Sequence, residues 1–192
     1  MHIIRAADCR RMPWKNGGGE TIEIAISPEG AGLDDFDWRL SMARVEDDGP
    51  FSLFTGVDRT LAILEGEGLV LSVGGQDPVR LTDRSAPCSF PADVETSSSL
   101  IAGPITDLNM MTRRSRFGHS MRRLMARGTS TPVVEADEIL LFCRNGAVEV
   151  GSDASLHLGP LETLHMRKAA GALQIKAIEP AELFLIEIAK AF

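Results

Sequence analysis

The sequence contains few cysteines and no long apolar run, and both absences exclude classes of protein. Its 192 residues include three cysteines, Cys9, Cys88 and Cys143, and no Cys-x-x-Cys pair. An odd number of widely spaced thiols is typical of a reducing compartment. No segment reaches the roughly 18 apolar residues of a membrane span, and the N-terminus contains no apolar signal core. We therefore expect a cytoplasmic protein without a membrane partner.

Histidine is scarce as well, which argues against a catalytic metal. A metal site of the His-x-His type needs several converging nitrogen and oxygen ligands. No two of the four histidines, His2, His119, His157 and His165, are two residues apart. We expect no metal and no cofactor, and we interpret His165 as an exposed or hydrogen-bonded histidine of the barrel. The sequence also lacks a phosphate-binding Gly-Lys-Ser/Thr loop and a Gly-x-Ser-x-Gly nucleophile elbow.

Positive charge is in deficit, with 20 Lys and Arg against 27 Asp and Glu and a formal net charge of -7. Nucleic-acid binding depends on clustered basic residues, so we expect no nucleic-acid partner. The one basic stretch, from Arg113 to Arg127, is interpreted as a solvated connection between domains. A weak helical candidate over residues 115–127 is the exception to an otherwise strand-like pattern, with a linker or strand as the alternative.

Short apolar runs separated by glycine and proline turns predict an all-β protein. In the run 38–43, alternation places Trp38, Leu40 and Met42 on one face of a strand and Arg39, Ser41 and Ala43 on the other. We expect Arg39 and Ser41 either to face solvent or to point into a cavity inside a barrel.

The order of elements repeats. Residues 61–71 and 139–150 both read as strand, glycine turn, strand, and we expect both to form hairpins, the second around Asn145-Gly146. Each is followed by a short leucine-centred strand and further apolar strands. The same order twice predicts two similar barrels in one chain. We place the first at 1–115, with the option that its N-terminal strands cross over to the second, and the second at 116–192.

Four stretches in the first 115 residues resemble the HutD/Ves family of small bicupin proteins, in the family's order. The most specific is Pro13-Trp14-Lys15-Asn16-Gly17-Gly18-Gly19-Glu20-Thr21, followed by Glu23. The others are residues 36–43, residues 48–52 with 56–59, and Gly103-Pro104 with Asp107, Asn109, Met111 and Arg113. Ala92 departs from the family, which tends to have glycine in this turn.

The resemblance implies an all-β bicupin fold, with two jelly-roll (double-stranded β-helix) barrels and little helix. It also implies a link to histidine utilisation, and a non-catalytic binding protein for a small carboxylate such as formylglutamate or urocanate that tunes pathway flux. Two further functions stay open: a metal-free enzyme, an isomerase or hydrolase using Lys15 or Glu23 as acid or base, and a regulator that acts through another protein. A homodimer is also open.

A carboxylate ligand favours an arginine for bidentate pairing, and Arg59 is the first candidate. Arg59 could instead form a structural ion pair with Asp58 or a nearby acid. Trp14 could plug the barrel, and Asn109 could be an amide that stabilises a turn. The complete set of predicted ligand-binding residues is Trp14, Lys15, Asn16, Arg39, Ser41, Arg59 and Asn109.

Overall fold

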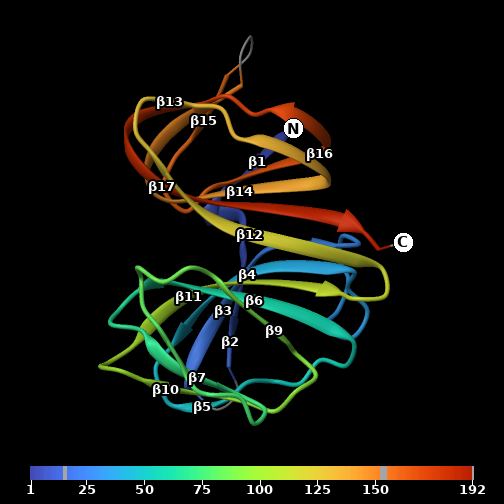
Figure 1. Cartoon of the computed structure of the whole chain (residues 1–192), viewed down its shortest axis with the longest axis vertical. Helices are drawn as coiled ribbons and strands as arrows, with labels where there is room; N and C mark the ends of the chain where they lie inside the picture. Colours follow the sequence, from blue (N-terminus) through green and yellow to red (C-terminus); the bar gives the residue numbers. More distant parts are fainter. Residues whose placement is uncertain (15–16, 152–154, 192) are drawn as a thin grey trace. The chain divides into compact units, whose positions relative to one another are not determined.

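The protein, seen here as a computed structural model, is built almost entirely of antiparallel β-strands (Figure 1). The structure describes residues 1–14, 17–151 and 155–191. It divides the chain into two compact units. Unit 2 comprises Cys9–Gly118 together with Ala191, and unit 1 comprises Met1–Asp8 and His119–Lys190. The boundary in the middle of the chain falls within strand β12 (Phe117–Ala126).

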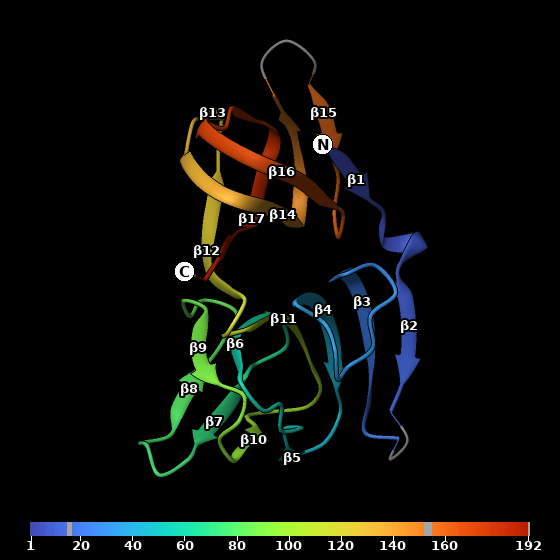
Figure 2. The same cartoon turned by 90° about the vertical axis from the view of Figure 1, so that its right-hand side faces the viewer.

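Unit 2 contains two antiparallel sheets (Figure 2). The six-stranded sheet has the order β2-β3-β4-β11-β6-β9, and the four-stranded sheet has the order β5-β10-β7-β8. The strands of unit 2 are β2 (Arg10–Pro13), β3 (Gly19–Ser27), β4 (Trp38–Val45), β5 (Gly49–Pro50), β6 (Val57–Glu65), β7 (Leu69–Val73), β8 (Val79–Leu81), β9 (Cys88–Pro91), β10 (Thr96–Leu100) and β11 (Ile105–Arg113).

The core of unit 2 lies between these two sheets, because its apolar side chains come from both. Leu61 and Ile63 on β6 pack with Leu69 and Leu71 on β7, and Phe90 on β9 belongs to the same cluster. The hairpin expected over residues 61–71 is wrong, since β6 and β7 belong to different sheets. The glycine turn between them carries the chain from one sheet to the other.

Unit 1 is one sheet of order β1-β16-β14-β17-β12, with β13 paired to β17 and β15 to β14. Its elements besides β12 are β1 (His2–Ile4), the 3-10 helix η1 (Ala6–Asp8), β13 (Thr129–Ser130), β14 (Val133–Val150), β15 (Leu156–Leu158), β16 (Thr163–Ala172) and β17 (Ile175–Lys190). Leu141, Leu164, Leu183 and Leu185 are among the fully buried residues of its core.

Two local predictions for unit 1 can be compared with the structure. Asn145-Gly146 forms no hairpin turn, because β14 continues through it and shifts register against β17. A residue pair that suits a tight turn also suits a bulge, since both use a positive φ, which is 72° at Gly146. Most of the helical candidate at 115–127 is strand β12, so the helix is wrong and the strand alternative is confirmed, and Met125, expected on the apolar face of a helix, is 64% exposed.

Candidate functional site

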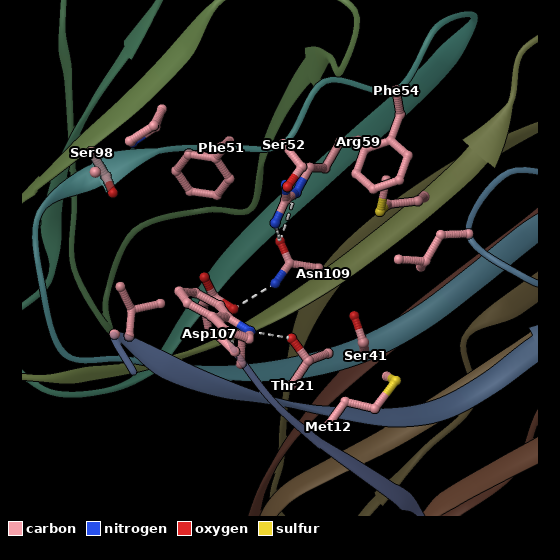
Figure 3. A pocket seen from close by; sticks show the side chains of 18 of the residues that line it. Met12, Thr21, Ser41, Phe51, Ser52, Phe54, Arg59, Ser98, Asp107 and Asn109 are labelled. Carbon is pink, nitrogen blue, oxygen red and sulfur yellow. Dashed lines mark hydrogen bonds between the residues drawn. The ribbon is translucent and has the colours of Figure 1, made fainter. Parts of the chain in front are cut away.

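Unit 2 contains a cavity of about 660 Å³ (Figure 3). Its polar lining includes side chains from the central strands β4, β6 and β11 of the six-stranded sheet, and its apolar lining includes Trp14, Phe51, Phe54 and Met111. The volume falls within the range of pockets that hold small molecules.

Strand register explains why the polar side chains gather there. Successive side chains in a strand point to opposite faces. On the central strand β11, Asp107 pairs with Ala43, Asn109 pairs with Ser41, and Met111 lies between Arg39 on β4 and Arg59 on β6. Alternate residues of three neighbouring strands therefore share one face, and that face lines the cavity.

Arg59 is the half-buried cation of the pocket. Its Nε and Nη2 groups donate to the side-chain oxygen of Asn109, at 2.8 and 2.6 Å, and its guanidinium carbon lies 4.4 Å from the ring centroid of Phe51. Burial lowers the pKa of Arg59 to about 10, and Asp107 opposes that shift. Asn109 and Phe51 thus orient a guanidinium that remains charged at neutral pH.

Asp107 is the buried acid of the same pocket, with 1% of its surface exposed. It accepts a hydrogen bond from the side-chain amide of Asn109 through Oδ1. Among the residues that the structure describes, Oδ2 has no hydrogen-bond partner. Burial raises the pKa of Asp107 to about 6, although Arg59, Asn109 and the Ala43 backbone amide each lower it.

A chain of side chains therefore crosses the pocket from Arg59 through Asn109 to Asp107 (Figure 3). The Asn109 amide uses its oxygen on the cation and its nitrogen on the acid. This arrangement fixes the orientation of the amide, because reversing it would break both contacts. Of the structural alternatives for Arg59, the ion pair with Asp58 does not form, since Asp58 pairs with Arg114 at 2.8 Å.

Arg39 is held by a second carboxylate. Its Nε donates to Glu23 at 2.7 Å and its Nη1 to Ser41 at 3.4 Å, and the Arg39 and Glu23 side chains are only 7% and 13% exposed. Together, the Arg39 and Glu23 side chains have almost no net charge. Arg39 and Ser41 line the cavity from β4, whereas Glu23 approaches Arg39 from the neighbouring strand β3.

The glycine-rich stretch borders the pocket. The indole nitrogen of Trp14 donates to the Thr21 hydroxyl at 2.8 Å, and the ring packs against the core of unit 2 while lining the cavity. Trp14 is therefore a wall of the pocket as well as a cover for the core. Lys15 and Asn16, both predicted to contact the ligand, lie outside the described residues.

Gly19, the third glycine of the stretch, packs against the backbone of β4. A methyl group added here would overlap the Arg44 carbonyl oxygen and lie 3.1 Å from two ring atoms of Trp14. We expect Gly19→Ala to destabilise the protein by about 1–3 kcal/mol and to change tryptophan fluorescence, because the backbone cannot move cheaply. Chemical denaturation measures the loss.

The control is Gly118→Ala, where nothing lies within 4 Å of the added carbon and φ is not positive. It should stay within about 0.5 kcal/mol of the wild type. Equal stabilities of the two variants would contradict this account of Gly19.

The structure thus brings Trp14, Arg39, Ser41, Arg59 and Asn109 to one cavity. Sequence reasoning assigned no role to Asp107. Asp107 could have been found, because it lies two residues before Asn109 in a strand and so shares its face. The position of Phe51 under Arg59 depends on packing and has no such signal.

The histidines do not gather in the pocket. His165 contacts Glu138 at 2.6 Å and stacks edge-on against His2, 5.0 Å away in unit 1. Among the described residues, no group of three or more His, Cys, Asp or Glu side chains could hold a metal ion. No helix in the described parts of the chain is long and apolar enough to cross a membrane.

Comparison with known sequences finds a matching family model and similar proteins. The family model described as HutD matches residues 6–185. A Pseudomonas putida protein named for its place in the hutC 3′ region is 40% identical over 150 residues, which cover 78% of this chain and 77% of that protein. Protein Ves from Citrobacter koseri is 42% identical over 119 residues, 60% of this chain and 61% of that protein, which is less than two thirds of its length.

Comparison with solved structures finds proteins of the same family and of the same fold. A conserved protein of unknown function from Pseudomonas aeruginosa PAO1 has a TM-score of 0.92 and 34% identity, and the match covers 98% of both chains. HutD from Pseudomonas fluorescens SBW25 has a TM-score of 0.85 and 33% identity over 100% of this chain and 99% of that one. YhhW from Escherichia coli, at 9% identity and a TM-score of 0.72, covering 97% and 96% of the chains, shares the cupin-like fold alone. On this evidence the chain belongs to the HutD family.

Proposed function

We propose that this protein binds a small carboxylate metabolite in the cavity of unit 2 and thereby tunes histidine utilisation in the cytoplasm. The observation that carries the proposal is the half-buried Arg59 guanidinium that lines the cavity. A guanidinium has five N–H groups, and among the described residues Asn109 accepts from two of its nitrogens. The remaining donors suit a carboxylate, which arginine binds in a bidentate manner.

The composition of the cavity supports binding without turnover. Its described lining contains no histidine, the commonest general acid–base residue of enzymes, and no cysteine, the residue that supplies a thiol nucleophile. The family's link to histidine utilisation directs the choice of ligand toward formylglutamate- or urocanate-like acids. In this proposal each unit is one cupin-type barrel, and the barrel of unit 2 holds the ligand.

Thermal unfolding with formylglutamate, urocanate or glutamate tests the proposal. A ligand present at about 100 times its Kd adds about 2.7 kcal/mol, which raises Tm by roughly 5–10 °C for a chain of this size. We expect at least one of these acids to do so, and calorimetric titration should give one site per chain. No stabilisation by any of them would overturn the proposal.

The metal-free enzyme remains the second candidate because one observation favours it: Asp107, a pocket acid whose pKa is raised to about 6. In that case Asp107 would take the role expected for Lys15 or Glu23, since Glu23 is engaged with Arg39. NMR of the acid after incubation with the protein separates the two functions. Unchanged ligand is expected for binding, and product that disappears in Asp107→Asn would indicate an enzyme.

A further inference from the structure

The N-terminal strand β1 belongs to unit 1 and is attached to it over a short length. Its three residues pair with β16 at the edge of the sheet, and His2 lies directly opposite His165 (Figure 2). Ile3 packs against the core of unit 1, and none of the three residues of the following helix η1 is buried. An edge strand with so few buried contacts opens at low free-energy cost, so a small change in charge is enough to shift its attachment.

The strand pairing brings two imidazole rings into contact. The rings of His2 and His165 meet edge-on, with their centroids 5.0 Å apart. The His2 side chain is exposed, whereas His165 is buried and its Nε2 lies 2.6 Å from Oε2 of Glu138 on β14. Because β16 lies between β1 and β14 in the sheet, the imidazole of His165 separates His2 from this carboxylate. When His165 is protonated, Glu138 balances its charge, and a proton on His2 would be added beside that cation.

The other charges that act on His2 are positive as well. Arg167 on β16 and the amino group of Met1 both oppose a proton on His2, as His165 does. The acid of the group, Glu138, is shared, because Oε2 contacts His165 and also lies 3.9 Å from Nε of Arg167. Partial removal from water lowers the pKa of His2, and the three positive neighbours lower it further.

We propose that the contact between His2 and His165 is a pH switch for the attachment of the N-terminal strand. With His2 neutral, β1 stays paired with β16; with both imidazoles protonated, two cations meet at a ring separation of 5.0 Å and the pairing weakens. Even in water, the repulsion of two unit charges at about this distance corresponds to about fourfold in an equilibrium.

The position of β1 in the chain gives the switch a consequence. The strand is followed by η1 and β2, and β2 leads directly to Trp14, which lines the cavity of unit 2. Release of β1 therefore frees the segment that precedes this wall of the cavity. The inference does not depend on which ligand the cavity binds, or on whether it binds one.

The direction of the pH effect follows from the two states of His2. In the released strand the imidazole returns to its ordinary pKa of about 6.5, and in the attached strand its pKa is lower. The released form therefore binds more protons than the attached form. Attachment is strongest above about pH 6.5 and weakens as the pH falls below that value.

Amide hydrogen exchange followed by NMR at about pH 5.5 and about pH 7.5 measures the attachment. These values lie on either side of the ordinary imidazole pKa and above those of ordinary carboxylic acids. Protection factors are compared, so that the intrinsic pH dependence of exchange cancels. We expect protection in the β1–β16 pairing to fall about fourfold or more at the lower pH, relative to amides of the buried β14–β17 pairing in the same sample.

A matched pair of variants assigns the effect to one ring. His2→Phe keeps an aromatic ring beside His165 but cannot take up a proton, so protection of β1 should change with pH by less than about twofold. His2 is exposed, and we expect this variant to fold. His157→Phe makes the same change at an exposed histidine on β15 of the same unit and should keep the full pH dependence.

Two results would overturn the switch. One is equal protection of the β1 amides at both pH values in the wild type, which needs no variant to interpret. The other is a His2→Phe variant that loses protection at low pH as strongly as the wild type, because the titrating group would then be elsewhere.

Discussion

Replacement of Glu182 by alanine is expected to destabilise unit 1 by about 3–5 kcal/mol, because it removes a buried carboxylate that pairs with two largely buried arginines. Glu182 on β17 lies 3.2 Å from Nε of Arg123 on β12 and 2.8 Å from Nη1 of Arg144 on β14. The Glu182 side chain is only 8% exposed, and each arginine side chain is 16% exposed. Arg123 also lies over the ring of the buried Phe184.

Urea unfolding monitored by circular dichroism measures this loss. The matched control is Glu149→Ala, which breaks an exposed pair with Lys176 in the same unit and should cost about 1 kcal/mol or less. The backbone amide of residue 182 keeps its bond to the Asn145 side chain in the variant, so the effect isolates the carboxylate. A loss below about 1 kcal/mol in Glu182→Ala would show that the two arginines find other partners.

Replacement of Arg59 by methionine is expected to weaken binding of the carboxylate ligand by about 100-fold or more. Charge-assisted bonds to a carboxylate contribute about 1.5–3 kcal/mol each, and this site would lose up to two of them. The measurement is calorimetric titration with the acid that stabilises the wild type. The proposed function predicts this loss with the fold intact.

The control for Arg59→Met is the free energy of unfolding of the variant, which separates a loss of binding from a loss of the fold. Burial lowers the pKa of Arg59 to about 10, so the charged side chain is held at some cost. Methionine has a similar length and no charge, and we expect the free energy of unfolding to change by less than about 2 kcal/mol. Arg59→Lys keeps the charge without the planar fork and should bind with intermediate affinity. Full affinity in Arg59→Met would remove Arg59 from the site.

Part of the site could be predicted from the sequence because strand geometry is local. Alternation along residues 38–43 was enough to place Arg39 and Ser41 on one face and Trp38 on the other. The same alternation places Asp107 on the same face as Asn109, two residues further along the strand. The glycine-rich stretch identified the family without any knowledge of its neighbours in space.

The remainder depended on contacts between distant segments. Asp58 had Arg59 beside it in sequence, yet it pairs with Arg114. Asn145-Gly146 satisfied every local requirement of a hairpin, but β17 pairs with β14 on both sides of these residues, from Glu138 to Val150, and turns them into a bulge. Leu64 and Leu69 flank a glycine turn and still belong to strands of different sheets.

The sequence by itself determined the all-β class, the family, and which side chains of a strand share a face, since each of these can be recognised within short continuous stretches of the chain. Only the tertiary structure decided which strands pair and in what register. Register placed Arg59, Asn109 and Asp107 on one face of β6 and β11 and left one acid oxygen without a hydrogen-bond donor among the residues that the structure describes. Strand pairing is settled by the burial of whole apolar faces, and that burial is a property of the assembled sheets rather than of any single segment.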